Sequence, residues 1–203
     1  MGLQSVGVVF ESGLRKDSGI TDREKRMTDK FRILAINPGS TSTKIAVFEG
    51  EEVVLSETVD HSTDELAPFE RMADQFAMRK SIILGFLEKK RIEVGTLSAV
   101  VGRGGLLKPI DGGTYRVNET MLADLRAAVR GEHASNLGAL IADAIAREAD
   151  CESFIVDPVV VDELNDLARF SGHPLLQRVS IFHALNQKRT ARIVSERIGK
   201  DYE

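Results

Sequence analysis

Three short apolar runs follow one another from residue 31: FRILAIN, KIAVFE and EVVLSETV. Each is rich in β-branched or other apolar residues and is bounded by turn residues, which is the pattern of β-strands. A six-residue loop, Pro38-Gly39-Ser40-Thr41-Ser42-Thr43, separates the first two runs, and Glu49-Gly50-Glu51 separates the next two. Because a glycine in a short connection suits a hairpin, we expect three successive antiparallel strands.

Helical spacing follows the third strand. Apolar residues between Pro68 and Lys90 recur on one helical face, which predicts a long amphipathic helix, and Leu97 to Val101 is typical of a short strand. Asn118 is placed to cap a helix that runs to Arg130 and ends at Gly131. Ser135 is placed to cap the next helix, which we expect to reach about Ala149.

The segment SFIV predicts a buried strand that stops at Asp157-Pro158. The resulting order, β-β-β-α-β-α-α-β, favours a mixed α/β sheet with helices on its faces. Beyond Pro158 we expect a helix near Val160 to Phe170, a Gly-His-Pro break, and a helix from about His183 to Ile198.

Composition narrows the class of protein. The chain has 203 residues, 42% of them hydrophobic, so it is long enough for one good core or for one domain and part of another. The net charge of −4 gives no basic excess and argues against a nucleic-acid partner. A single cysteine, Cys151, excludes an intramolecular disulfide, and no apolar run is long enough to span a membrane or to form a secretory signal. We therefore expect a cytoplasmic protein without a membrane partner.

Residues 1–30 have mixed charge and no sustained period, which predicts a disordered leader. Met27 offers an alternative start just before the first strand.

The loop between the first two strands has the chemistry of an anion site. Glycine backbone N–H groups and serine or threonine hydroxyls donate hydrogen bonds, and Lys44 adds a positive charge directly after them. Phosphate is the expected guest. The segment is not a Walker A loop, which needs a second glycine before its lysine and Ser or Thr after it. Taken alone, the loop is also compatible with a polar hairpin that binds nothing.

The order of strand, Gly-Ser/Thr-rich turn, strand and third strand resembles the actin-like superfamily of sugar and acetate kinases, chaperone ATPases and actin. Residues 37–44, NPGSTSTK, are similar to the N-x-G-S-x-S-x-K signature of acetate and butyrate kinases. Further segments resemble butyrate kinases in the same order: VVGRGGLLKPIDGGTYRVNE, GEHASNLGALIA, FIVDPVVVDEL and SIFHALNQK. Acetate kinases have R-V-V-H-G-G where this chain has GRGG, and this departure favours the butyrate and branched-chain fatty acid kinases.

The resemblance implies a ribonuclease H-like (actin-like ATPase) mixed sheet with flanking helices, followed by the start of a truncated second domain. The implied boundaries are a leader over 1–30, an N-terminal kinase domain over 31–157, and the beginning of a second kinase domain over 158–203. The implied reaction is transfer of the γ-phosphoryl of ATP to butanoate, reversibly, with Mg²⁺ as cofactor and ADP as the other product. Isobutyrate or acetate is the alternative acceptor, and the complete enzyme is expected to be a homo-oligomer.

The resemblance also assigns catalytic roles to single residues. Arg103 is expected to hold a carboxylate or phosphoryl group through its planar guanidinium, and it binds substrate together with His133. His133 and His183 are expected to donate to phosphoryl oxygens. Asp157 is expected to direct Mg²⁺, through water, from the carboxyl edge of the sheet. The alternative interpretations are a surface arginine, two structural histidines and, for Asp157, a helix N-cap.

The phosphate and ATP-binding set completes the expected site. Asn37 would orient the transferred phosphoryl group, and the other members line the same loop: Gly39, Ser40, Ser42 and Lys44. Thr41 is the weakest member, and His61 and His173 are interpreted as structural. A different class of function stays open, a non-catalytic fragment or interaction domain, because the second-domain segments of such kinases do not appear in the sequence.

Overall fold

The computed structural model describes residues 31–202. The predicted leader over 1–30 lies outside these described residues. The elements in chain order are β1 (Arg32–Pro38), β2 (Ser42–Glu49), β3 (Glu52–Asp60), α2 (Thr63–Leu66), η1 (Met72–Gln75), α3 (Phe76–Lys89), η2 (Val94–Thr96), β4 (Ala99–Arg103), β5 (Thr114–Arg116), α4 (Glu119–Arg126), α5 (Asn136–Ala149), β6 (Glu152–Val156), η3 (Asp166–Arg169), β7 (Phe170–His173), β8 (Leu176–Gln177) and α6 (Ala184–Ile198).

One mixed sheet organises the first part of the described chain, with the strand order β3-β2-β1-β4-β6-β5. β1, β2 and β3 pair antiparallel, as their hairpin connections predict, while β1–β4 and β4–β6 are parallel. The predicted mixed sheet is confirmed. β5 was not predicted, because its three residues, TYR, are too short a run to show the alternating pattern of a strand.

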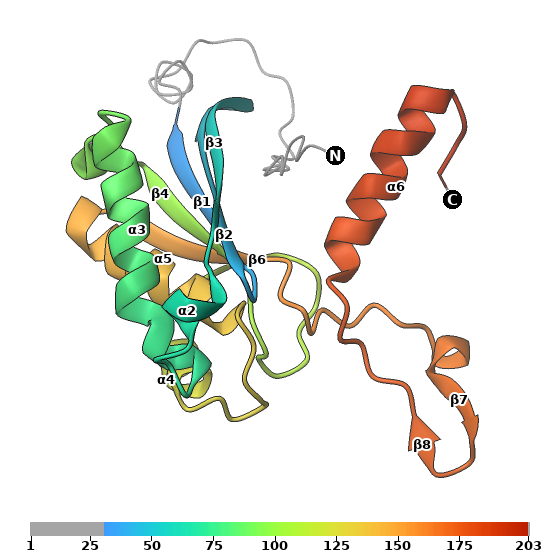
Figure 1. The fold of residues 1–203 in the computed structure, drawn as a ribbon. Coiled ribbons are helices and arrows are strands. Elements are labelled where there is room, and N and C mark those ends of the chain that lie inside the picture. The colour runs from blue at the N-terminus through green and yellow to red at the C-terminus, as the bar shows by residue number, and fades with distance from the viewer. Residues whose placement is uncertain (1–30, 203) are drawn as a thin grey trace.

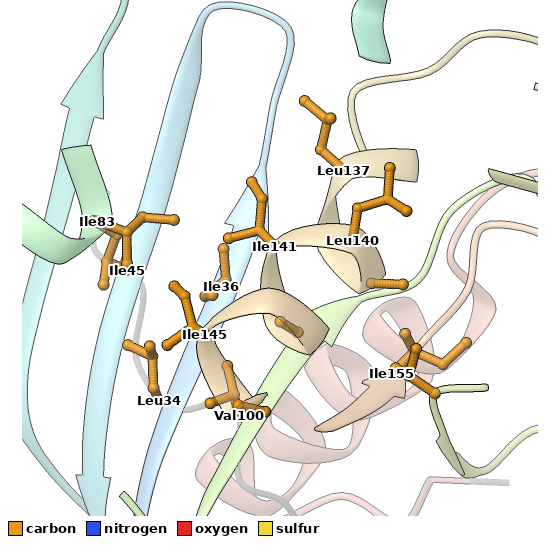
Figure 2. Packing of buried hydrophobic residues seen from close by; sticks show 14 of the residues in the cluster. Leu34, Ile36, Ile45, Ile83, Val100, Leu137, Leu140, Ile141, Ile145 and Ile155 are labelled. Atoms are coloured by element: carbon orange, nitrogen blue, oxygen red, sulfur yellow. The ribbon is translucent and has the colours of Figure 1, made fainter. Parts of the chain in front are cut away.

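Helices α3 and α5 cover one face of this sheet (Figure 1). Alternate residues of the strands point towards them, because successive side chains of a strand face opposite sides. Figure 2 shows Leu34, Ile36 and Val100 from the strands meeting Ile141 and Ile145 of α5. The opposite face of the strands carries the side chains that alternate with these.

Several predicted boundaries were wrong, and tertiary contacts explain the difference. The helix expected from Pro68 begins only at Phe76, because the carboxylate of Glu132 binds the side chain of Arg71 and the backbone N–H of Met72, which holds that stretch in a 3₁₀ turn. The helix capped by Asn118 is correctly placed but ends at Arg126 rather than Arg130.

The other corrections concern strands and caps. β1 and β2 extend into the predicted six-residue loop, since Pro38 pairs with Thr43, and the strand expected over 97–101 lies at 99–103. Ser135 precedes α5 as predicted, but its hydroxyl contacts His133 and makes no capping bond.

The helix expected near 160–170 is absent from the described structure. Val159 and Val160 instead lie in a turn that is closed by a hydrogen bond from the N–H of Val161 to the carbonyl of Pro158. All three valines are buried, and Val161 bridges to Ile110. A short buried apolar run has no period that identifies its backbone conformation, which is why the prediction failed here. The following segment forms η3 and the β7–β8 hairpin, and the predicted last helix is confirmed as α6.

α6 and the β7–β8 hairpin stand apart from the sheet (Figure 1). They carry a high share of exposed apolar side chains, including Phe170, Leu175, Leu176, Val194 and Ile198. Within residues 31–202 no helix has the length and apolar character needed to cross a membrane.

β4 and α5 touch through their backbones. A Cβ built on Gly102 would lie 2.2 Å from the carbonyl oxygen of Gly138, and one built on Gly138 would lie 2.1 Å from that of Arg103. Real Cβ atoms do not approach so closely, so both positions require glycine. This contact fixes the backbone of Arg103 against the first turn of α5.

We predict that Gly138→Ala destabilises the fold by about 1–3 kcal/mol, because the new methyl group overpacks the contact with β4. The matched control is Gly85→Ala in α3, where an added Cβ meets nothing within 4 Å. That change should stabilise the helix by about 0.5–1 kcal/mol. Urea denaturation of the two variants measures both effects, and equal stability of the two would contradict the close contact.

Candidate functional site

Three polar side chains form a row across the face of the sheet opposite α3 and α5. Asn37 pairs with Lys44 across β1 and β2, and on its other side the register that joins Ile36 to Gly102 places it beside Arg103. Since Ile36 and Gly102 face the helices, the residues after them face the other way. Adjacent strands lie about 4.8 Å apart, so the row spans about 10 Å, on the scale of a small phosphorylated ligand. The structure brings together these three predicted residues.

Arg103, Asp157 and His183 are in direct contact. A terminal nitrogen of Arg103 donates to Oδ2 of Asp157 at 3.1 Å, and Nδ1 of His183 lies 3.3 Å from the same oxygen. Nδ1 of His183 also lies 2.8 Å from the backbone carbonyl of Asp157. A carbonyl only accepts, so Nδ1 of His183 carries a hydrogen and Nε2 is the outward nitrogen of the ring.

Asp157 combines both interpretations that its sequence position allowed. Its Oδ1 accepts from the backbone N–H of Leu185, in the first turn of α6, so the carboxylate does cap a helix, although a more distant one than expected. Asp157 and His183 both have left-handed backbones, with φ of 45° and 50°. Non-glycine residues rarely adopt this conformation, and such strain gathers at functional sites.

His133 lies close enough to Arg103 and His183 to interact electrostatically with both. Burial and these two neighbours lower the pKa of His133 below its usual range. The backbone N–H of Ser135 donates to Nδ1 of His133, and the Ser135 hydroxyl lies 2.6 Å from the same atom. Nδ1 is therefore an acceptor, and the neutral ring carries its hydrogen on Nε2, where it is free to donate to an anion.

The turn between β1 and β2 is tightly held. The backbone N–H of Gly39 donates to the carbonyl of Ser42 at 2.7 Å, while Ser40 and Thr41 are exposed. Beneath the turn lies Arg79 of α3, which is fully buried. Sequence reasoning missed this arginine, because an arginine followed by Lys80 in a helix carries no motif.

Two buried polar residues next to Arg79 were also underestimated. Thr43 is fully buried, and its hydroxyl lies 2.8 Å from Nε2 of His61 while accepting a hydrogen bond from Arg79. Nδ1 of His61 is buried without a partner in the described structure. Burial and then the charge of Arg79 lower the pKa of His61, so this histidine is neutral at pH 7. Nothing in the structure contradicts the interpretation of His61 as a structural residue. Its side chain contacts Thr43 beneath the candidate phosphate turn.

The glycines around Arg103 serve packing. A Cβ on Gly104 would meet Pro158 at 2.8 Å, and one on Gly105 would meet Asn136 at 2.4 Å. Asn136 also accepts from the backbone N–H of Leu106 through its side-chain oxygen. The GRGG segment is thus pressed between α5 and the chain after β6, which holds Arg103 in place.

Metal binding was assigned to Asp157 alone. Within the described range, no three His, Cys, Asp or Glu side chains gather into a group that would hold a metal ion. Mg²⁺ commonly binds one or two carboxylates plus substrate phosphates and water, so a single carboxylate fits an ion that arrives with a nucleotide. Both oxygens of Asp157 already accept hydrogen bonds, which favours contact through water.

The chain is similar in sequence to butyrate kinases. It is 59% identical over 174 residues to butyrate kinase 2 of Clostridium acetobutylicum, covering 86% of this chain and 49% of that protein. It is 54% identical to a probable butyrate kinase of Clostridium botulinum, covering 85% of this chain and 49% of that one. This degree of identity makes them homologues. The chain spans about half the length of these relatives, and no protein-family model matches it.

Solved structures agree on the fold. The acetate kinase of Porphyromonas gingivalis superposes with a TM-score of 0.56 at 13% identity, covering 85% of this chain and 50% of that one. A propionate kinase from Francisella tularensis gives 0.54 at 14% identity, with 84% and 50% covered. The predicted fold class, a mixed sheet with flanking helices, is therefore confirmed, and this chain has the fold of about half of these two kinases.

We predict that the stability of the chain falls between pH 7 and pH 5. Because the pKa values of His61 and His133 are lowered in the folded state, the unfolded chain takes up more protons below about pH 6.5, and stability rises with pH in this window. Urea denaturation at pH 5, 6 and 7 measures the slope. His61→Gln should flatten it, whereas His173→Gln, at an exposed position, should not. A wild-type stability that is independent of pH would contradict the prediction.

Proposed function

We propose that this chain is part of a short-chain carboxylate kinase that transfers the γ-phosphoryl group of ATP to butanoate, giving butanoyl phosphate and ADP reversibly. The observation that carries the proposal is the contact of Arg103, Asp157 and His183 beside Asn37 and Lys44, on one face of the sheet. The relatives at 52–59% identity are named butyrate kinases, which supports this acceptor over acetate. Isobutyrate and acetate are the alternative acceptors, and the assay below compares butanoate with acetate.

The chemistry needs alignment more than proton transfer. A short-chain carboxylic acid is ionised at pH 7, like Asp and Glu, so the nucleophile needs no general base. The protein must hold two anions in line and stabilise the charge that spreads over the transferred group. Arg103, Lys44 and the turn at 39–42 supply positive charge and donors for that purpose.

We assign the individual roles as follows. Arg103, oriented by Asp157, binds the acceptor carboxylate or the moving phosphoryl group. His133 donates from Nε2 as a neutral ring, while Asn37 orients the phosphoryl group through its amide. His183 donates from Nδ1 to the backbone carbonyl of Asp157, and its Nε2 donates to a phosphoryl oxygen when the ring is protonated. Mg²⁺, bound with the nucleotide and held through water by Asp157, would neutralise phosphate charge.

The nucleotide phosphates would lie on the turn between β1 and β2. Its members are Gly39, Ser40 and Ser42, with Lys44 at the start of the row on the sheet. We further propose that residues 31–157 form the first kinase domain and that 158–203 begin the second. The exposed apolar side chains after residue 166 would then contact the part of the enzyme that corresponds to the other half of the relatives.

We predict that acyl phosphate forms when the matched part of this chain is joined to the remaining part of the Clostridium acetobutylicum relative. ATP and butanoate are supplied, and hydroxylamine traps the product. Butanoate should give more product than acetate. Hydrolysis of ATP without acyl hydroxamate would overturn the carboxylate kinase assignment, and the 203-residue chain alone serves as the comparison.

In the same chimera, Arg103→Ala should lower kcat/KM by about tenfold to a hundredfold, because a charged hydrogen bond contributes about 1.5–3 kcal/mol. Its melting temperature should change little. Arg116→Ala is the matched control, since this arginine of β5 is exposed and pairs with Glu152 away from the row. Equal losses of activity and melting temperature in Arg103→Ala would indicate a structural arginine instead.

A further inference from the structure

Arg79 of α3 reaches the β1–β2 turn with its whole guanidinium group. Its Nε and one terminal nitrogen donate to Oε1 of Gln75, at 3.0 and 2.8 Å. The other hydrogen bonds go to the turn and its flank, at 2.8 to 3.1 Å, with these acceptors: the carbonyl oxygens of Gly39, Ser40 and Ser42, and the hydroxyl of Thr43. α3 is thereby tied to the turn through one side chain.

These contacts decide where the amides of the turn point. In a trans peptide the C=O of one residue and the N–H of the next point in opposite directions, and none of the described peptide bonds is cis. The carbonyls of Gly39 and Ser40 point inward to Arg79, so the N–H groups of Ser40 and Thr41 point outward. Within residues 31–202 neither N–H has a hydrogen-bond acceptor. The turn therefore presents two adjacent free donors, and successive backbone N–H groups of this kind suit an anion.

The charge of Arg79 has no counter-ion in the described structure. It is fully buried, all its acceptors are neutral, and it forms no ion pair with a described carboxylate. An arginine stays charged in a protein, and a buried charge without a partner is costly to fold. An anion bound on the outer side of the turn would supply the missing negative charge.

We propose that Arg79 is a positioning residue for phosphate: it holds the turn carbonyls inward so that the amides of Ser40 and Thr41 bind a phosphoryl oxygen, and it places a positive charge beneath them. This inference rests on the proposed function of the turn. It also explains why three backbone carbonyl oxygens of a short turn all accept hydrogen bonds from the buried guanidinium of Arg79. Gln75 and Thr43 accept further hydrogen bonds from Arg79 and so fix the orientation of its guanidinium plane.

The test is a titration of the ¹⁵N-labelled 203-residue chain with inorganic phosphate, followed through the amide signals of Ser40 and Thr41. In the wild type both signals should shift. Arg79→Met should weaken phosphate binding by about tenfold to a hundredfold, and Arg79→Lys, which keeps the charge but loses the fork, should restore part of it. Lys80→Met is the matched control, because this neighbouring cation pairs with Glu148 and should leave binding unchanged.

Binding is measured below the melting transition of each variant, so a loss of stability alone does not alter the result. If Arg79→Met does not fold, the phosphate affinities of Arg79→Lys and Gln75→Leu test the role of Arg79 instead. Gln75→Leu keeps the arginine and removes the side-chain oxygen that orients it. Both should bind phosphate more weakly than the wild type.

The outcomes separate the two proposals. Wild-type affinity in the folded Arg79 and Gln75 variants would overturn the role of Arg79 and leave the phosphate turn intact. Failure of the wild-type amides to respond to phosphate would overturn the turn as a phosphate site, and the inference with it.

Discussion

The backbone contact between β4 and α5 is the constraint on which the candidate site depends. Gly102 and Gly138 allow the strand and the helix to approach closer than any side chain would permit. The first turn of α5 therefore lies against the loop that follows Arg103, and the segment before it brings His133 close to Arg103. A larger residue in either glycine position would push the helix outward and move the histidine away from the arginine. The packing of α5 on β4 therefore also sets the geometry of the candidate site.

The two key arginines differ in how their charge is balanced. Arg103 is partly exposed and pairs with Asp157, which fixes its direction but also offsets its charge. Arg79 is buried and has only neutral acceptors within the described chain, so its full charge acts on the turn above it. A pair of this kind suits two tasks. The first arginine would recognise a bound group by its geometry, whereas the second would raise the electrostatic potential at the proposed phosphate turn.

The sequence predicted those features that local pattern or motif spacing determines. The hairpin strands, the Asn118 cap and the last helix follow from apolar periodicity and turn residues, and the motifs located Arg103, Asp157 and His183 before any coordinates. Distant contacts decided the rest. The start of α3 depends on Glu132, which lies 60 residues from Met72, and the turn after Pro158 leads into a bridge between Val161 and the distant Ile110. Arg79 was not predicted, because its hydrogen bonds go to backbone carbonyls about 40 residues earlier in the chain, and no local pattern indicates such contacts.

A phosphoryl group bound to the row on the sheet would need protection from water. Charges 4 Å apart interact with only about 1 kcal/mol in water and with about 4 kcal/mol near a protein surface, so a face open to solvent gives weak catalysis. An enzyme built on this sheet must therefore cover the row with a second body. The relatives are about twice as long as the matched region, and the segment after residue 166 offers apolar side chains for a body to contact. On the proposed function, the cations that would bind phosphate lie on this chain, while the exclusion of water that catalysis needs would come from a second body that covers them.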